Sequence, residues 1–406
     1  MKHPEQDDKR TFFGLGIAPK ILELLEKMEF TTPTPIQYKA IPIGLEGKDI
    51  IGVAQTGTGK TLAFGIPMIQ RLTQDKSLGL VVVPTRELAI QVDETINKIG
   101  SPFGIRTAVL IGGAAMYNQL KALRRSPRVV IATPGRLNDH LNQKTIRLEN
   151  VKVFVLDEAD RMLDMGFMPQ IERIMQHLPK ERQTMLFSAT IPEKIVRIAA
   201  KYMKLPIGVE IAPSGTAAKN IAQELFIINR EEKPKLLEKL LHEYRGTVLL
   251  FSRTKRGATR ITKGLKNMGH RVAEIHSDRS LAQRREALDG FKSGRYRILV
   301  ATDIAARGID VKGIELVINY DLPDDSENYV HRIGRTGRAG HEGRAISFAT
   351  PDQRRDVRNI ENVMKKSLPV AEHPEVPAAG FEVAATRTFR PRGRQFNRFR
   401  GPRKRR

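Results

Sequence analysis

Short apolar runs in this chain alternate with stretches whose apolar positions recur at helical spacing, and several runs lead directly into polar loops. Residues 80–83 lead into Pro84-Thr-Arg-Glu87, residues 129–131 into Ala132-Thr-Pro-Gly-Arg136, and residues 185–187 into Ser188-Ala-Thr190. This alternation predicts an α/β fold with a parallel sheet. Because ligand sites in such sheets lie at the carboxyl ends of the strands, we expect these loops to share one edge.

The pattern restarts in the second half of the chain. Composition changes near residues 204–220, as is typical of a linker, and residues 247–251 then lead into Ser252-Arg-Thr254. Residues 298–300 lead into another loop, which begins Ala301-Thr-Asp303. A chain of 406 residues is also too long for one ordinary core. We therefore predict two α/β domains, and no short-period repeat indicates a solenoid.

A Gly-rich segment, Ala54-Gln-Thr-Gly-Thr-Gly-Lys-Thr61, follows the apolar residues 50–53. A Gly-rich turn between strand and helix points backbone N–H groups at phosphate oxygens. In the pattern G-x-x-x-x-G-K-[ST], the Lys reaches the β- and γ-phosphates and the hydroxyl ligates Mg²⁺. Ala54 replaces the first Gly, so a chance Gly-rich turn is the alternative. Gly57, Gly59, Lys60 and Thr61 together favour a phosphate site.

Two acids, Asp157 and Glu158, end the apolar run at residues 151–156. An acid at the end of a buried strand can deliver its carboxylate to Mg²⁺. The neighbouring Glu can then orient or deprotonate an attacking water. Acid pairs at strand ends are mostly solvated, so this pair is informative only together with the phosphate cradle. The two segments together predict an enzyme that hydrolyses a nucleoside triphosphate.

The net charge of +24 indicates a nucleic-acid partner, and it is unevenly distributed. Residues 387–406 carry +10 without a single acid, and Phe389, Phe396 and Phe399 interleave with their Arg residues. Such a segment buries too little to fold alone, but it can wrap phosphates and stack bases. A merely solubilising tail is the alternative.

The chain has no Cys, no apolar leader and no run of about 18 apolar residues, so we expect a cytoplasmic protein.

The second half lacks a phosphate cradle but contains His331-Arg-Ile-Gly-Arg-Thr-Gly-Arg338. An Arg supplied across a domain cleft can stabilise charge on a transferring phosphoryl group. A solvated basic helix end and an RNA phosphate contact are the alternatives. Given the triphosphate site in the first half, we interpret Arg335 and Arg338 as the groups that act on the phosphoryl group.

These motifs, in this order over residues 12–350, resemble those of the DEAD-box ATP-dependent RNA helicases of superfamily 2, of bacterial type. The resemblance implies two tandem RecA-like parallel-sheet domains joined by a short linker. It implies an N-terminal arm at residues 1–10, an ATP-binding domain at residues 11–207 and a linker at residues 208–220. A second domain at residues 221–368 and a disordered basic tail at residues 369–406 would follow.

The resemblance also implies the ATP contacts. Phe30-Thr-Thr-Pro-Thr-Pro-Ile-Gln37 is similar to the Q motif, in which Gln37 would bind the adenine edge and Phe30 would stack on its ring, with Phe12 as the upstream aromatic. Glu29 stands where a Gly is expected, which affects local turn geometry. Mg²⁺ would be held by Thr61 and Asp157, partly through water. The implied ATP-binding set is Phe30, Gln37, Thr56, Gly57, Thr58, Gly59, Lys60, Thr61 and Asp310, the last on the ribose.

The resemblance also implies RNA contacts in both domains. These residues would hold the sugar-phosphate backbone of the RNA and leave its base sequence unread. In the family pattern a Gln begins the helix that carries Arg284, but here that position is Leu281, which weakens the expectation of RNA contact there. The implied RNA set is Pro84, Thr85, Arg86, Gly112, Gly113, Thr133, Pro134, Arg136, Arg253, Arg284 and Thr302. Coupling between the sites would involve Asp160, Ser188, Thr190 and His331.

The implied mechanism is a hinged clamp that closes on ATP and single-stranded RNA, bends one strand and expels its partner. It would separate short duplexes and remodel RNA–protein complexes. A DNA translocase of the same superfamily and a passive RNA chaperone are the rival functions. The set Lys60, Glu158 and Arg335 argues against a passive chaperone. Ribosome assembly, messenger decay and cold adaptation are all compatible, so the ribosome and the RNA-decay machinery are candidate partners.

Overall fold

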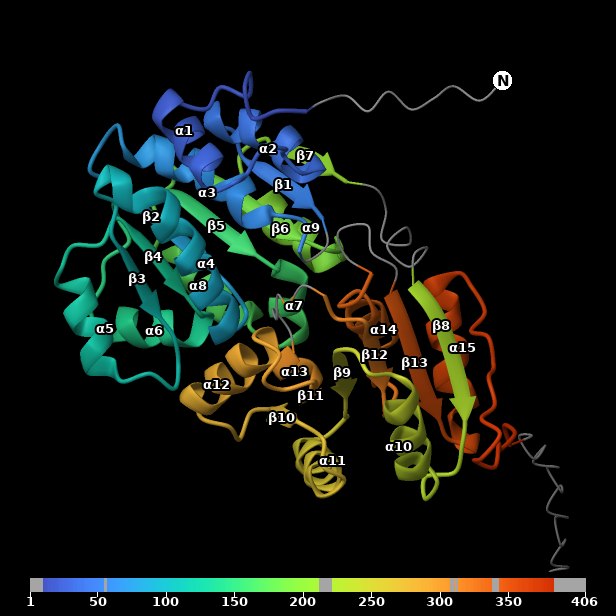
Figure 1. The fold of residues 1–406 in the computed structure, drawn as a ribbon. Coiled ribbons are helices and arrows are strands. Elements are labelled where there is room, and N and C mark those ends of the chain that lie inside the picture. Colours follow the sequence, from blue (N-terminus) through green and yellow to red (C-terminus); the bar gives the residue numbers. More distant parts are fainter. Residues whose placement is uncertain are drawn as a thin grey trace, which may run out of the picture.

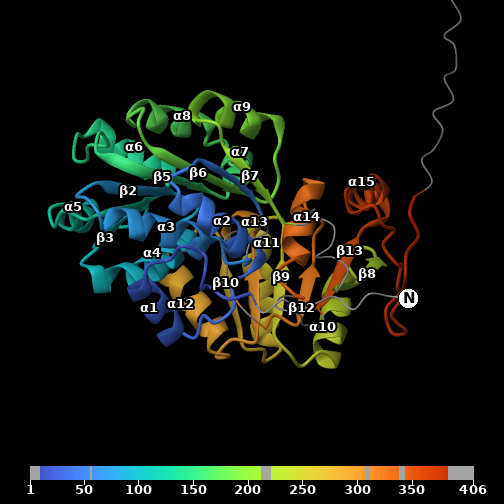
Figure 2. The ribbon, with the colours of Figure 1, turned by 90° about the horizontal axis from the view of Figure 1, so that it is seen from above.

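The computed structural model describes residues 10–54, 57–211, 221–306, 311, 313–337 and 343–382. These residues form two α/β domains, each built on one parallel sheet (Figure 1). The domains lie next to each other, with helices on both faces of each sheet (Figures 1 and 2). The predicted fold class of two parallel-sheet α/β domains is therefore confirmed. No described helix is both long enough and apolar enough to cross a membrane.

The first domain has a seven-stranded sheet in the order β3-β4-β2-β5-β6-β1-β7. Its strands are β1 (Ile50–Val53), β2 (Leu78–Val82), β3 (Thr107–Leu110), β4 (Val129–Ala132), β5 (Val151–Asp157), β6 (Gln183–Ser188) and β7 (Ile207–Glu210). Its helices are α1 (Pro19–Lys27), α2 (Pro35–Leu45), α3 (Lys60–Leu72), α4 (Arg86–Gly100), α5 (Met116–Leu123), α6 (Pro134–Asn142), α7 (Ala159–Asp164), α8 (Met168–Gln176) and α9 (Glu193–Tyr202).

The second domain has a six-stranded sheet in the order β10-β11-β9-β12-β13-β8. Its strands are β8 (Ile221–Ile227), β9 (Val248–Phe251), β10 (Val272–Ile275), β11 (Ile298–Ala301), β12 (Leu316–Asn319) and β13 (Gly343–Ala349). Its helices are α10 (Lys233–Glu243), α11 (Lys255–Asn267), α12 (Leu281–Lys292), α13 (Asp303–Ala306), α14 (Ser326–Ile333) and α15 (Arg354–Met364).

Continuous apolar runs become central strands because each sheet is covered on both faces. Successive side chains of a strand point to opposite faces. Val81 accordingly packs in one apolar cluster of the first domain and Leu80 in the other. In the second domain Leu249 and Leu250 divide between two clusters in the same way. Burial on both faces explains why these strands do not alternate between apolar and polar residues.

Two domain boundaries differ from those predicted. The first domain does not end at residue 207, because β7 pairs with β1 and completes the sheet. The second domain does not end at residue 368, because the following segment runs along β8: Leu225 N donates to Pro369 O at 2.8 Å and Ala379 N to Ile227 O at 2.9 Å. Residues 1–9 of the predicted arm, residues 212–220 of the predicted linker and residues 383–406 of the predicted tail lie outside the described residues.

Candidate active site

The phosphate-cradle lysine lies beside the first acid of the Asp157–Asp160 segment, at the carboxyl ends of β1 and β5. Lys60 begins α3, and its Nζ donates to the Ala54 carbonyl at 2.9 Å. The same Nζ lies 3.9 Å from Asp157 Oδ1, and both side chains are buried. One parallel sheet thus brings together two groups that lie almost a hundred residues apart in sequence.

The backbone of the cradle needs glycine. Gly57 and Gly59 adopt φ angles of 81° and 86°, in the left-handed region that other residues rarely occupy. Gly59 is also the N-cap of α3, and a Cβ there would clash with the Gln37 side chain. Thr58 and Thr61 belong to the described part of this segment, whereas the predicted contact Thr56 lies outside it.

The Gln37 amide connects α2 to the cradle. Its Oε1 accepts from Thr34 N at 2.9 Å, and its Nε2 donates to Gly59 O at 3.0 Å. Phe30 is 39% exposed and open to a stacking partner, whereas Phe12 is buried in the core of the first domain. Adenine recognition by Gln37 and Phe30 stays a prediction. Nearby Glu29 has a φ of 60°, which is the geometry that a Gly would favour.

Asp157 and Glu158 lie in different environments. Burial raises the pKa of Asp157 to about 6 although Lys60 opposes the shift, so this carboxylate is one that a bound cation would stabilise. Thr61 lies next to Lys60 at the start of α3, and the Thr61 and Asp157 side chains fit a Mg²⁺ ion shared with a bound triphosphate.

The Glu158 side chain is held by an ion pair. Its Oε2 accepts from Arg161 at 2.9 Å, and both side chains are buried. The role of Arg161 was not predicted, although its i,i+3 spacing from Glu158 is a usable signal.

Asp160 ties α7 to the loop after β6. Its Oδ2 accepts from Ala189 N at 3.0 Å and from Thr190 N at 2.9 Å, while Asp160 N donates to Ser188 Oγ at 3.1 Å. Burial favours a higher pKa for Asp160, but the positive charges of Lys60, Arg161 and His331 outweigh it and lower the pKa. His331 belongs to the second domain, so the electrostatic environment of Asp160 spans both domains.

The predicted RNA-facing loops of the first domain gather at the ends of the adjacent strands β3, β4 and β2. The Arg86 guanidinium lies over Gly112 and Gly113, so that a Cβ on Gly113 would clash with it. Thr85 caps α4 by accepting from Leu88 N at 3.2 Å. Arg136 donates to Ala114 O at 3.2 Å, and Thr133 and Pro134 begin the same helix, α6.

The second domain places Arg253 after β9 and Thr302 after β11, which are neighbouring strands. Arg284 makes a contact that the sequence did not predict. Its guanidinium lies 2.9 Å from Glu87 Oε2 of the first domain, and its side chain is only 10% exposed. Leu281, one turn earlier, packs against the apolar cluster of the first domain. The RNA contact of Arg284 stays a prediction, and the partner residue Glu87 was not identified from sequence.

The three Arg residues of the 331–338 segment have different surroundings. Arg332 is buried, forks onto Asp303 with distances of 2.5 and 2.7 Å, and lies 4.9 Å from the centre of the Phe251 ring. It therefore links α14 to α13 and β9 within the domain. Arg335 is 3% exposed, beyond the end of α14. The predicted contacts Asp310 and Arg338 lie outside the described residues.

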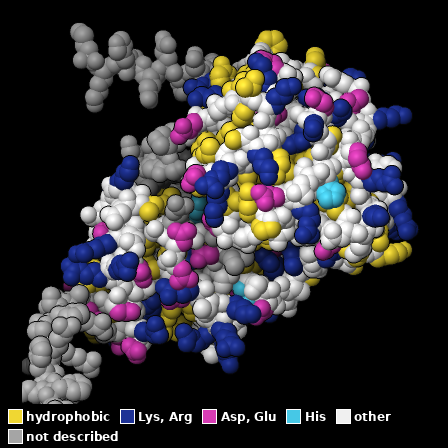
Figure 3. All heavy atoms as spheres, turned by 180° about the vertical axis from the view of Figure 1, so that it is seen from behind, with side chains coloured by type: hydrophobic (Ala, Val, Ile, Leu, Met, Phe, Trp, Pro, Cys, Tyr) yellow, Lys and Arg dark blue, Asp and Glu magenta, His cyan; other side chains and the backbone are white. Residues whose placement is uncertain are grey.

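On one face of the molecule, the basic side chains are not gathered into a single patch. Lys and Arg side chains are spread over both domains on the face shown in Figure 3, with acids among them. The strand ends and their contacts, and not the charge on this face, locate the candidate site.

Family models match both domains. Residues 34–198 match the DEAD/DEAH box helicase family and residues 232–340 match the helicase conserved C-terminal domain. The chain is 45% identical to the DEAD-box ATP-dependent RNA helicase CshA of Geobacillus kaustophilus, over 91% of this chain and 80% of the relative. It is 44% identical to the ATP-dependent RNA helicase CshA of Listeria monocytogenes, over 89% and 70% of the two chains.

Solved structures indicate how the domains are arranged. Saccharomyces cerevisiae Dbp5 bound to RNA and ADP BeF3 has a TM-score of 0.80 at 32% identity, covering 89% of this chain and 95% of that chain. A DEAD box protein from Methanococcus jannaschii is more similar in sequence, at 39% identity over 89% and 99% of the chains, but its TM-score is 0.54. Over a similar share of this chain, the two domains together therefore superpose better on the RNA-bound structure than on the protein with the more similar sequence.

Proposed function

Because the chain belongs to the DEAD-box ATP-dependent RNA helicases, we propose that it uses RNA-stimulated ATP hydrolysis to separate short RNA duplexes locally and to remodel RNA–protein complexes. The observation that carries this proposal is the contact set of Asp160. This carboxylate joins the acids beside Lys60 to the Ser188–Thr190 loop and lies in the field of His331 from the second domain. A change at the triphosphate can therefore reach both domains.

At the triphosphate, Lys60 and the Gly57–Gly59 backbone would bind the phosphate groups, and Gln37 and Phe30 would select adenine. A Mg²⁺ ion held by Thr61 and Asp157 would neutralise phosphate charge. Glu158, held in place at Oε2 by Arg161, would orient the attacking water and take up its proton on the carboxylate. Arg335 and Arg338 would stabilise the charge that develops on the transferring group from the side of the second domain.

On the RNA, the loops after β2, β3 and β4 would hold one stretch of backbone and those after β9 and β11 the next. Closure of the two domains would bend that strand, and a bent strand cannot stay paired with its partner. Backbone contacts leave the base sequence unread, and 2′-hydroxyl contacts would select RNA over DNA. We also propose the cytoplasm as the location, and the ribosome and the RNA-decay machinery as partners.

The test measures ATP turnover with RNA, with DNA and without polymer, together with unwinding of RNA duplexes of increasing length. We expect RNA alone to stimulate turnover, and unwinding to fall steeply as the duplex lengthens. A Lys60→Ala variant controls for contaminating ATPases. Equal stimulation by DNA would support a DNA translocase, and duplex separation without ATP would support a passive chaperone.

A further inference from the structure

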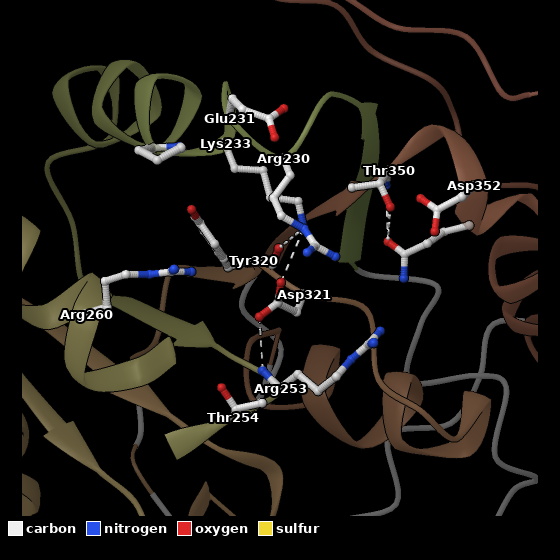
Figure 4. Close-up of a pocket in the computed structure, with 12 residues that line it drawn as sticks. Arg230, Glu231, Lys233, Arg253, Thr254, Arg260, Tyr320, Asp321, Thr350 and Asp352 are labelled. Atoms are coloured by element: carbon white, nitrogen blue, oxygen red, sulfur yellow. Dashed lines mark hydrogen bonds and ion pairs between the residues drawn. The ribbon is translucent and has the colours of Figure 1, made fainter. Parts of the chain in front are cut away.

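The second domain contains a hollow of about 580 Å³ that the proposed ATP and RNA contacts do not use, apart from Arg253 on its wall. Its lining comes from segments that follow four strands of the sheet (Figure 4). Arg230 follows β8, Arg253 follows β9, Asp321 follows β12, and Thr350 follows β13. The hollow therefore lies at the carboxyl edge of the sheet, where α/β domains bind ligands.

The sheet topology singles out this part of the edge. From β9 the chain crosses to β10 on one side, whereas from β12 it crosses to β13 on the other side, and β9 and β12 are neighbours. Adjacent strands whose connections leave in opposite directions open a crevice, which is the preferred ligand position in open α/β sheets. Arg253 and Asp321 line the hollow at this pair of strands.

The hollow is lined by four basic side chains and three acids, but the acids are not equally available. Asp321 is engaged inside the wall: it accepts from Ser252 Oγ at 3.2 Å and from Arg253 N at 3.1 Å, and it pairs with Lys233 at 3.3 Å. Glu231 is exposed at the rim and its carboxylate points away from Asp321 in Figure 4.

Arg230 and Arg260, by contrast, have no hydrogen bond or ion pair with another residue of the described part of the chain. Figure 4 shows them on opposite sides of Tyr320 and Asp321, Arg260 from α11 and Arg230 from the segment after β8. Burial lowers the pKa of Lys233, and the charges of Arg230 and Arg253 lower it further, against the effect of Asp321. The third acid, Asp352, is exposed, and a hydrogen bond with Thr350 and the charges of Arg230 and Lys233 lower its pKa. The lining still has four basic side chains against three acids, and the Arg230 and Arg260 guanidinium groups are available to a ligand.

We propose that this hollow is a phosphate-binding site, in which Arg230 and Arg260 bind phosphate groups of an RNA strand that extends beyond the cleft between the domains. Guanidinium groups bind phosphate through paired hydrogen bonds. RNA is favoured as the source because Arg253 belongs both to the hollow and to the predicted RNA-facing loops, so one strand can continue from one to the other. A free polyphosphate has the same chemistry. The RNA source rests on the function proposed above, whereas the phosphate site does not.

The experiment compares the full chain with an Arg230→Ala/Arg260→Ala variant. Both substituted side chains are exposed, so folding should be unaffected. The matched control, Arg355→Ala/Arg358→Ala, removes the same charge from exposed positions of α15. Each protein is titrated with the shortest single-stranded RNA that fully stimulates wild-type ATP turnover, and with strands extended at the 5′ or the 3′ end. Calorimetry with inorganic tripolyphosphate tests the other source.

We expect the variant to bind one of the extended strands about five- to tenfold more weakly, the effect of losing two partly solvated charge-assisted hydrogen bonds. The slope of log K against log salt should flatten by about 1.4, because each phosphate neutralised on a single strand contributes about 0.7. The shortest strand should be unaffected, and the control variant should match the wild type.

The variant could lose tripolyphosphate binding and keep its RNA affinity. That result would support the phosphate site, with a free polyphosphate and not RNA as the ligand. Equal losses with short and extended strands, equal losses in the control variant, or no loss for either ligand would overturn the proposal. Absence of RNA-stimulated turnover in the wild type would instead refute the proposed function, and the tripolyphosphate measurement would still decide on the phosphate site.

Discussion

Arg284 and Glu87 form a buried ion pair between the two domains, with the guanidinium nitrogen 2.9 Å from the carboxylate oxygen. Arg284 lies on α12 and Glu87 on α4, so the contact depends on the relative placement of the domains. Burial lowers the pKa of Arg284 although Glu87 opposes the shift. The pair forms only where α4 and α12 adjoin, and its contribution to that arrangement can be tested.

Removing either partner should weaken clamp closure. Arg284→Ala leaves the Glu87 carboxylate buried without its cation, so RNA binding in the presence of a non-hydrolysable ATP analogue should weaken by about 2 kcal/mol, roughly thirtyfold. A double-mutant cycle with Glu87→Gln tests the pair, because the two substitutions should be non-additive. RNA binding without nucleotide is the control and should change little. Additive effects would mean that the pair does not stabilise the closed state.

Glu158→Gln should separate binding from chemistry. Gln can still accept the hydrogen bond from Arg161, and Lys60 and Asp157 are untouched, so the protein should bind ATP and RNA and stay closed. Turnover should fall by about 10²–10⁴ because general base catalysis is lost. Lys60→Ala should instead lose ATP binding. If single-turnover assays gave a near-normal rate of ATP hydrolysis for Glu158→Gln, Glu158 could not be the group that activates water.

Arg335→Ala and Arg338→Ala should each lower turnover by about 10³–10⁵, the contribution expected of an arginine finger. ATP affinity, measured by equilibrium binding, should change far less. Arg332→Ala is an instructive contrast: its fork to Asp303 is buried within the second domain, so that variant should lose thermal stability. If turnover were normal in both finger variants, these residues would be assigned to RNA contact.

The sequence predicted the parts of the fold that depend on local pattern. Buried parallel strands appear in the sequence as continuous apolar runs, and the loops that follow them carry recognisable residues. Both sheets and the Lys60–Asp157 site could therefore be predicted from the sequence. Arg161, Glu87 and the structural role of Arg332 were missed because a buried ion pair depends on tertiary neighbours that no short pattern encodes. The edge strand β7 and the segment along β8 were missed because each contributes few apolar residues and relies on pairing with a distant strand.

Glu29→Gly should stabilise the first domain. Glu29 has a φ of 60°, which costs a residue with a Cβ about 1–2 kcal/mol. Gly removes this strain but loses more backbone entropy on folding, so we expect a net gain of about 1 kcal/mol. Chemical denaturation of the variant measures it, with Glu26→Gly in α1 as a control that should destabilise. A loss of stability in Glu29→Gly would show that the Glu29 side chain contributes more than its backbone costs.

Ending the chain at Thr386 removes +10 of charge and three Phe residues, and touches none of the site residues. RNA affinity should fall alike for all sequences, while ATP turnover at saturating RNA persists. Ten phosphates neutralised on a single strand would contribute about −7 to the slope of log K against log salt, as an upper bound. Because a basic segment rarely pairs every charge at once, we expect truncation to reduce the slope by about 2–5.

A second variant separates the charge of this segment from base stacking. Replacing Phe389, Phe396 and Phe399 by Ser keeps every Arg, so the salt slope should be unchanged. Affinity should still fall, because stacking contributes about 1–3 kcal/mol per base. An unchanged slope after truncation would mean that the segment does not bind RNA, and its +10 charge would then point to an acidic surface on a protein partner.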